Sequence, residues 1–370
     1  MLMANLHVLH DSFQQSPWLD NLSRRIIEDG TLAKLIQDGI RGVTSNPTIF
    51  EKSLADSTVY DAAIQESHLN KASAQLLYWQ LAVQDIQHTA DLLRPVFDES
   101  NGQDGFVSIE VSPELAHNAA ASIAQAHDLW RRIDRPNLMI KIPATEDCLP
   151  AISQLTTDGV NVNITLMFSL ERYQQVINAY LTGLENREGD LHNIRSVASF
   201  FISRVDSKVD AQLDQIDNVE AHNLKGRTGI AQGWLAYQLF QESFSPDNER
   251  WSSLQARGAN LQLPLWASTS VKNPDYDPLL YVKGLLAPHT INTLPNTTID
   301  AIEHAPYDAL SNEAGISADK FDTGTSIMES LQRLGISIRD VTDQLETEGI
   351  QKFHESFMSM LSTLATKMPD

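Results

Sequence analysis

The chain has 370 residues, enough for one large domain or two ordinary ones, and its 42% hydrophobic and 20% charged content is typical of globular proteins. The net charge of -21 argues against DNA, RNA or an anionic membrane as the main partner, although a small anionic substrate needs only a local basic pocket. The single cysteine, Cys148, excludes an intrachain disulfide and fits a reducing, cytoplasmic location. The first 15 residues lack a cationic start and an apolar run, so we expect no signal peptide and no membrane span.

Short apolar runs alternate with helical stretches along the chain, which is the pattern of βα units. Helical sequence fills about 23–38, 59–93 and 206–254. The eight predicted strands are, in chain order, 16–20, 42–46, 106–111, 137–143, 160–166, 197–202, 265–269 and 290–293. This order predicts an α/β fold, a (β/α)₈ TIM barrel, which needs about 250 residues.

The residues beyond the about 250 that a barrel needs lie after the sixth strand and in the C-terminal tail. The tail ends in an amphipathic helix, with Ile350, Phe353, Phe357, Leu361 and Leu364 at helical spacing. We therefore expect residues 1–370 to form a single barrel domain with extra helices after strand six and a helical extension over about 305–370.

The fourth predicted strand, Asn-Leu-Met-Ile-Lys-Ile-Pro at 137–143, contains a lysine within an apolar run. Burying an ammonium group costs several kcal/mol unless the group is paired or loses its proton. Burial favours the neutral amine, which is a nucleophile toward carbonyl groups. The alternative is an edge strand whose Lys141 points toward water.

Side-chain alternation in the neighbouring strands places further polar groups on one face. In a barrel the apolar face meets the helices, so the polar face points inward, and active sites lie at the carboxyl ends of the strands. Individually these residues could be turn or hydrogen-bonded core groups, but together they indicate one cavity. The inward set is Asp20, Asn46, Glu110, Lys141, Asn163, Thr165 and Ser199, with Thr44 sharing the parity of Asn46 and Phe201 that of Ser199.

This set contains the parts of a lysine Schiff-base enzyme. Lys141 would attack a ketone, and the carboxyl groups of Asp20 and Glu110 would move protons. Thr165 could position water, and the amide side chains could hold substrate hydroxyls. We expect no metal or cofactor, because the iminium is itself the electron sink and the eleven histidines are scattered.

Several segments resemble transaldolase in its longer bacterial form. The most specific are Gly-Val-Thr-Ser-Asn-Pro-Thr-Ile-Phe at 42–50, Met-Ile-Lys-Ile-Pro-Ala-Thr at 139–145 and Gly-Val-Asn-Val-Asn-Ile-Thr-Leu-Met-Phe-Ser at 159–169. Segments 198–206, 266–274, 290–295 and 341–353 are also similar, so the resemblance runs from near Trp18 to near Phe357.

The resemblance implies transfer of a dihydroxyacetone unit from sedoheptulose 7-phosphate or fructose 6-phosphate to glyceraldehyde 3-phosphate or erythrose 4-phosphate. It implies a lysine Schiff base and a place in the non-oxidative pentose phosphate pathway. The catalytic residues that it implies are Lys141 as the Schiff-base lysine, Glu110 and Asp20 as proton-transfer acids, and Thr165 acting through water. The implied substrate-binding residues are Asn46, Asn163 and Ser199 for the dihydroxyacetone part, Phe201 for the pocket wall, and Arg204, Lys272 and Ser268 for the phosphate.

Other interpretations remain open at this stage. Arg204 beside Asp206 could form a surface pair, and Lys272 could be a solvated loop cation. The chain could also be a Schiff-base aldolase that releases free dihydroxyacetone, or a non-catalytic sugar-phosphate-binding protein. Either a monomer or a homodimer is compatible with the sequence.

One position departs from the family pattern, because Cys148 stands where its members usually have glycine. We expect a packing effect, which would matter only if the backbone there needed a positive φ.

Overall fold

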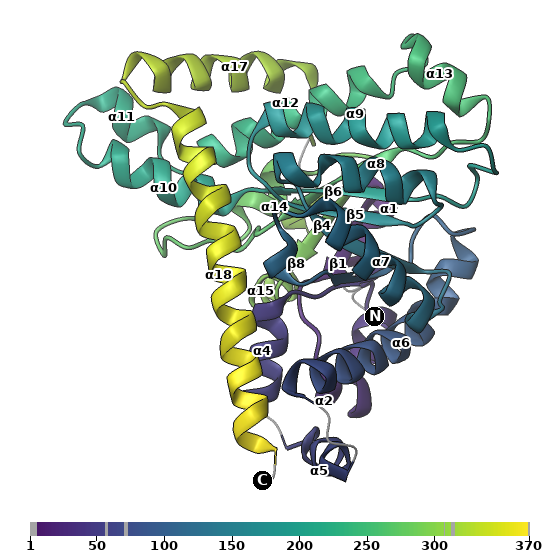
Figure 1. The fold of residues 1–370 in the computed structure, drawn as a ribbon. Helices are drawn as coiled ribbons and strands as arrows, with labels where there is room; N and C mark the ends of the chain where they lie inside the picture. The colour runs from purple at the N-terminus through teal and green to yellow at the C-terminus, as the bar shows by residue number, and fades with distance from the viewer. Residues whose placement is uncertain (1–5, 56–57, 70–72, 307, 312–314, 369–370) are drawn as a thin grey trace.

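Eight parallel strands close into a barrel in which each strand pairs with its neighbours in chain order, β1 to β8, and helices surround it (Figure 1). The computed structural model describes residues 6–55, 58–69, 73–306, 308–311 and 315–368. The strands are β1 (Gln15–Leu19), β2 (Gly42–Thr44), β3 (Val107–Glu110), β4 (Leu138–Pro143), β5 (Val162–Met167), β6 (Ser196–Phe201), β7 (Gln262–Ala267) and β8 (Thr290–Leu294). The predicted (β/α)₈ barrel is therefore confirmed.

Helices connect the strands and extend beyond the last one. In the first half of the chain they are α1 (Leu6–Phe13), α2 (Arg24–Glu28), α3 (Thr31–Gln37), α4 (Pro47–Ala55), α5 (Asp61–Leu69), α6 (Ala74–Glu99), α7 (Ala119–Ile133), α8 (Leu149–Thr157) and α9 (Leu170–Asn186). In the second half they are α10 (Ser203–Leu213), α11 (Val219–Leu224), α12 (Thr228–Ser243), α13 (Glu249–Gln255), α14 (Leu280–Gly284), α15 (Asn296–His304), α16 (Asp308–Ser311), α17 (Ala318–Arg333) and α18 (Ile338–Lys367).

Three predicted helical stretches are divided into shorter helices. The stretch 59–93 contains α5 and α6, and the side chain of Ser73 caps the start of α6. The predicted helix over 23–38 is split into α2 and α3 by Gly30, whose φ of 81° lies in the left-handed region. The predicted helical region 206–254 contains four helices, and the side chains of Asn218 and Asn248 cap the starts of two of them. Helix α1 was not predicted.

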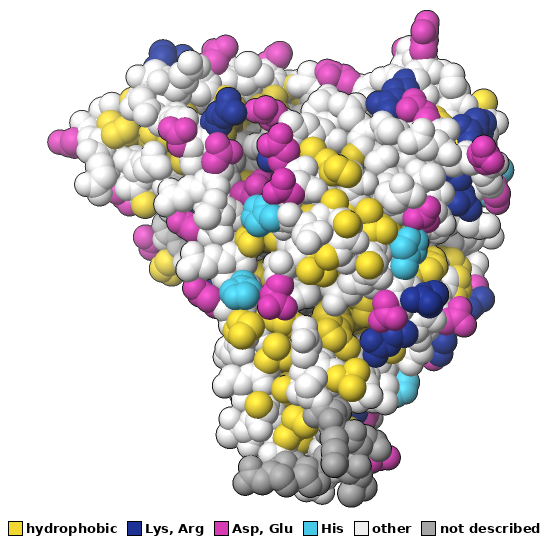
Figure 2. All heavy atoms as spheres, in the orientation of Figure 1, with side chains coloured by type: hydrophobic (Ala, Val, Ile, Leu, Met, Phe, Trp, Pro, Cys, Tyr) yellow, Lys and Arg dark blue, Asp and Glu magenta, His cyan; other side chains and the backbone are white. Residues whose placement is uncertain are grey.

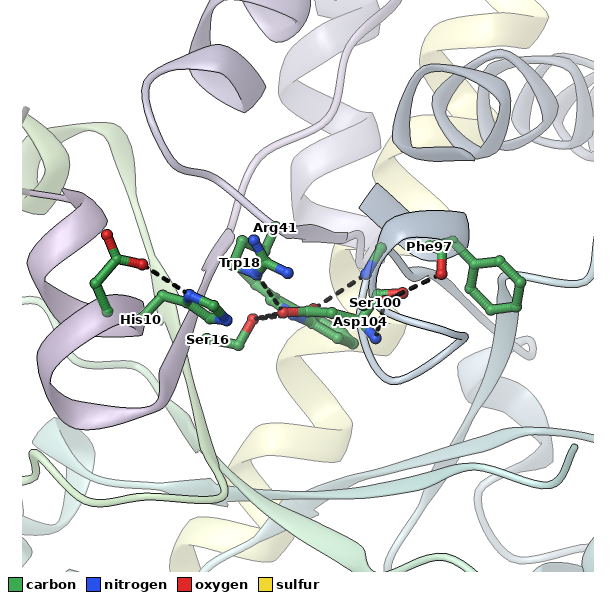
Figure 3. A network of polar contacts seen from close by, with 9 residues as sticks. His10, Ser16, Trp18, Arg41, Phe97, Ser100 and Asp104 are labelled. Atoms are coloured by element: carbon green, nitrogen blue, oxygen red, sulfur yellow. Dashed lines mark hydrogen bonds and ion pairs between the residues drawn. The ribbon is translucent and has the colours of Figure 1, made fainter. Parts of the chain in front are cut away.

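A buried polar network stabilises the N-terminal end of the barrel (Figure 3). The carboxylate of Asp104 accepts hydrogen bonds from Ser16 Oγ at 2.6 Å, Trp18 Nε1 at 3.1 Å and Arg41 Nε at 2.7 Å. Gly42 lies so close that a Cβ on it would stand 2.4 Å from the Trp18 ring, so only glycine fits there. This network fixes β1 against the segment that leads into β3.

Helix α18 is the longest element of the tail and runs past α10 and α4 (Figure 1). Its apolar stripe is buried, as the spacing predicted, through Phe353, Phe357 and Leu364. The helix also contacts β5. The tail therefore packs on the barrel itself, beside the carboxyl ends of the strands. No helix in the described ranges is both long and apolar enough to cross a membrane.

Candidate active site

A cavity of about 290 Å³ opens at the carboxyl ends of the barrel strands. All the predicted site residues line this cavity except Glu110 and Asn163. These two are buried behind its wall, Glu110 next to Lys141 and Asn163 next to Ser199. The predicted residues in its wall are Asp20, Asn46, Lys141, Thr165, Ser199, Phe201, Arg204, Ser268 and Lys272. A larger cavity, of about 590 Å³, lies at the opposite end of the barrel, and none of the predicted site residues line it.

Lys141 is the central group of this cavity. Its strand, β4, pairs with β3 and β5 in a closed barrel, so the edge-strand alternative is wrong. The residue is only 5% exposed. Its Nζ donates to Thr44 Oγ1 at 3.3 Å and to the Ser45 carbonyl at 3.1 Å, and it lies 3.7 Å from Glu110 Oε2. The amine is thus held beside a carboxyl group and faces the cavity.

Burial sets the proton affinity of the two predicted acids. Burial raises the pKa of Glu110 from 4.5 to about 7, although the charge of Lys141 acts in the opposite direction. Burial also raises the pKa of Asp20, and this effect is opposed first by Lys141 and then by Arg204. A carboxyl group with a pKa near 7 can both give and accept a proton at neutral pH.

Hydrogen bonds orient the polar floor of the cavity. Ser199 Oγ donates to Asn163 Oδ1 at 2.7 Å, and Asn163 Nδ2 donates to Ser108 Oγ at 3.0 Å, which connects β6, β5 and β3. Asn46 Oδ1 accepts from the Ile49 amide at 3.0 Å, so Asn46 starts α4 as well as lining the cavity.

Two non-glycine residues at the rim have left-handed backbone conformations. Leu166, with φ of 58°, follows Thr165 where the β5–β6 register shifts. Ser268, with φ of 57°, follows β7, and its hydroxyl lies 3.0 Å from that of Ser203. Such conformations cost about 1–3 kcal/mol each and cluster at functional sites. Here Leu166 lies at the irregularity within β5, next to Thr165 of the cavity wall, and Ser268 itself lines the cavity.

Cations gather on one side of the mouth. Arg204 stacks over Phe201, with Cζ 5.2 Å from the ring centroid, and burial lowers the pKa of Arg204. Burial and the charge of Arg204 both lower the pKa of Lys272. The surface-pair interpretation of Arg204 is wrong, because Asp206 is 1% exposed and accepts from the Gly229 amide at 2.8 Å. Both cations line the cavity, Lys272 from an exposed position in the loop after β7.

Some lining residues were not predicted as site residues. They are Thr44, Thr48, Ile49, Lys52, Leu265, Ala267, Ser270, Thr293, Pro295, Lys352 and Phe353. The alternation of β2 already pointed to Thr44, but the amphipathic pattern of the tail does not indicate that Lys352 reaches the barrel mouth.

Cys148 is fully buried with φ of -96°, and its Sγ lies 3.3 Å from the Ala116 carbonyl. Its backbone therefore needs no positive φ, and its effect is one of packing, as expected. The described part of the chain contains no grouping of three or more His, Cys, Asp or Glu side chains suited to a metal ion.

Comparison with known proteins gives the family. A family model described as transaldolase/fructose-6-phosphate aldolase matches residues 17–364. The chain belongs to this family. It is 44% identical to a transaldolase of Mycobacterium tuberculosis over 350 residues, 94% of this chain and 92% of that protein. It is 43% identical to a transaldolase of Thermobifida fusca over 355 residues, 95% of each, and 45% identical to one of Mycobacterium leprae over 353 residues, 94% of this chain and 92% of that protein.

Proposed function

We propose that this protein is a transaldolase, a transferase that moves a dihydroxyacetone unit between sugar phosphates in the non-oxidative pentose phosphate pathway. The donors are sedoheptulose 7-phosphate or fructose 6-phosphate, and the acceptors are glyceraldehyde 3-phosphate or erythrose 4-phosphate. Family membership supports this proposal. The observation that carries it is the buried amine of Lys141, 3.7 Å from the Glu110 carboxyl group at the carboxyl end of a (β/α)₈ barrel.

In this mechanism the amine of Lys141 adds to the ketose carbonyl carbon. Glu110, whose pKa of about 7 lets it hold a proton at neutral pH, protonates the departing hydroxyl as water leaves and the iminium forms. Thr165 Oγ1 is buried without a hydrogen-bond partner among the described residues, so it is free to hold a water that relays this proton.

Carbon–carbon cleavage then needs a base near the donor's C4 hydroxyl. Asp20 takes that proton, the C3–C4 bond breaks, and its electron pair flows into the iminium to give an enamine while the aldose leaves. The acceptor aldehyde reacts with the enamine, and Asp20 returns the proton to the new hydroxyl. The raised pKa of Asp20 makes its carboxylate a stronger base for this step.

The polar floor and the cationic side of the mouth divide substrate recognition between them. Asn46, Asn163 and Ser199 hold the hydroxyls of the dihydroxyacetone part, and Phe201 forms the wall beside it. Arg204 and Lys272 bind the phosphate, with Ser268 beside them. This division follows the increase in solvent exposure along the cavity, from the buried amine of Lys141 to the more exposed side chains of Arg204 and Lys272.

Reduction with borohydride tests the proposal. With fructose 6-phosphate present, borohydride should fix a three-carbon unit on Lys141, detectable by mass spectrometry of peptides. Lys141→Ala should abolish both the adduct and turnover, whereas Lys34→Ala, which removes an exposed lysine of α3, should change neither. Wild-type protein that forms no adduct would indicate a non-catalytic sugar-phosphate-binding protein.

The family description also names fructose-6-phosphate aldolase, so a simple aldolase is the second candidate. Release of free dihydroxyacetone from fructose 6-phosphate, measured with and without erythrose 4-phosphate, separates the two. A transaldolase consumes the donor at a useful rate only when the acceptor is present.

We also propose a cytoplasmic location and a monomeric or homodimeric state. The single cysteine supports the first proposal. Light scattering of the purified protein tests the second.

A further inference from the structure

The cavity is cationic in a strongly acidic protein. Acidic side chains are spread over the face drawn in Figure 2, most densely around α10, α11 and α17, and the whole chain has a net charge of -21. The acidic side chain in the cavity wall is Asp20, whereas the cations in that wall are Lys52, Lys141, Arg204, Lys272 and Lys352. Like charges held together raise the free energy of the free protein, so this arrangement indicates a site for an anion.

The mechanism gives no role to Lys52 and Lys352. In the described part of the chain, no carboxylate lies within ion-pair distance of either amine. By contrast, Lys367 of α18 lies 3.7 Å from Asp61, and Lys208 of α10 pairs with Glu348 of α18 at 2.5 Å. That contact also engages the acid one turn before Lys352. Both amines therefore line the cavity without an ion-pair contact to a carboxylate of the described residues.

Packing of α18 places Lys352 at the cavity rim. Gly349 lies against the barrel so closely that a Cβ there would be 3.1 Å from Leu166 Cδ2 and 3.7 Å from Arg204 Nη1. Lys352 and Phe353 follow three and four residues later and therefore share this helix face. One turn further on, Ser356 Oγ lies 2.9 Å from Thr48 Oγ1 of α4. The helix thus crosses the rim from Arg204 to α4, with Lys352 between them.

Lys52 approaches the same space from α4. Its charge lowers the pKa of both Asp20 and Lys272, and the charge of Lys352 lowers the pKa of Lys272. The side chains that face this space from the packed elements are therefore mainly cationic. A doubly charged phosphate group is the anion that the proposed substrates bring to this end of the cavity.

We propose that Lys352 of the C-terminal helix and Lys52 of α4 bind the substrate phosphate together with Arg204 and Lys272. The inference rests on the proposed function and assigns α18 a part in substrate selection. The two amines strengthen binding of phosphorylated sugars, while the chemistry at Lys141 proceeds without them.

Steady-state kinetics of Lys352→Gln and Lys52→Gln test this inference. Each change should raise the KM for fructose 6-phosphate about tenfold, as expected for loss of one charge-assisted contact, and leave kcat within about threefold. The inhibition constant of inorganic phosphate should rise by a similar factor. The low kcat/KM for unphosphorylated fructose should stay unchanged, and Lys352→Arg should keep wild-type values within about threefold.

Arg339→Gln is the matched control, because it removes the same charge from an exposed site on the same helix. It should change none of these constants. Unchanged KM and phosphate inhibition in a lysine variant, or equal losses for fructose and fructose 6-phosphate, would overturn the assignment for that residue. Thermal melting checks that each variant folds, and Lys52→Gln gives an independent result on a separate helix.

Failure of the inference can be told from failure of the proposed function. The adduct on Lys141 at saturating fructose 6-phosphate should form in wild type and in both lysine variants. Wild type without an adduct rejects the proposed function. An adduct in wild type combined with unchanged constants in the variants rejects only the phosphate role of Lys52 and Lys352.

Discussion

Glu110→Gln separates the catalytic role of this carboxyl group from its effect on stability. The amide keeps the shape of the side chain but neither donates an acidic proton nor titrates. We expect kcat to fall by about a hundred- to ten-thousand-fold, the usual contribution of a general acid–base group. Wild-type kcat/KM should show a limb with an apparent pKa near 7, and the variant should lack this limb.

The same substitution should change the pH dependence of stability. Between pH 4.5 and about 7 the folded protein keeps the Glu110 proton while the unfolded chain has lost it, so Glu110 lowers stability as pH rises through this window. At about 1.4 kcal/mol for each pKa unit, the total is about 3 kcal/mol. Glu110→Gln should therefore be more stable than wild type by up to about 3 kcal/mol above pH 7, and equal to it below pH 4.5.

Two measurements check this reasoning. Initial rates with fructose 6-phosphate and erythrose 4-phosphate, coupled to NADH oxidation through the glyceraldehyde 3-phosphate formed, give the pH profiles. Urea unfolding at pH 4.5, 6 and 8 gives the free energies. A variant with full activity, or one whose stability follows wild type at every pH, would refute the assignment of Glu110 as a buried group that titrates near neutrality.

Three further substitutions probe separate parts of the structure. Asp104→Ala should lower the free energy of unfolding by about 3 kcal/mol, because it leaves Arg41 without its partner. The kcat of the folded enzyme should stay at the wild-type value. Urea unfolding checks the first expectation and rate measurements check the second. Gly349→Val should lower the free energy of unfolding by about 1–3 kcal/mol through overpacking, and it should raise the KM for fructose 6-phosphate by displacing Arg204. An unchanged KM would mean that α18 moves away from the barrel and Arg204 stays in place. Thr165→Val should lower kcat about tenfold or more without changing the melting temperature, as expected for loss of one proton-positioning hydrogen bond.

The sequence predicted the barrel and most of the cavity because strand side chains alternate strictly between two faces. Once Lys141 and Glu110 were placed inward, the closed barrel brought them within 3.7 Å of each other. The same rule gave Asn163 and Thr165. The register shift between β5 and β6 lies between Ile164 and Met167, yet Thr165 still pairs with Pro143 of β4 and lines the cavity.

Other features could not be predicted from single residues. The apolar stripe of α18 showed which helix face is buried but not what it packs against, so the position of Lys352 at the rim was missed. Asp104 lies in a loop, and nothing in the surrounding sequence shows that it accepts hydrogen bonds from Ser16, Trp18 and Arg41. Such contacts depend on the closure of the barrel, which brings residues distant in the chain together.

Charge also links substrate binding to the chemistry at Asp20. The cations Lys141, Arg204, Lys272 and Lys52 each lower the pKa of this carboxyl group, against the raising effect of burial. A phosphate dianion bound among the rim cations offsets their charge, so the pKa of Asp20 rises when a phosphorylated donor is in place. In the proposed mechanism Asp20 would then be a stronger base for the C4 hydroxyl proton when cleavage requires one. The rim cations Lys52 and Lys352 should therefore affect affinity far more than the chemical step, because the bound phosphate offsets their charge, including the charge that Lys52 would otherwise exert on Asp20.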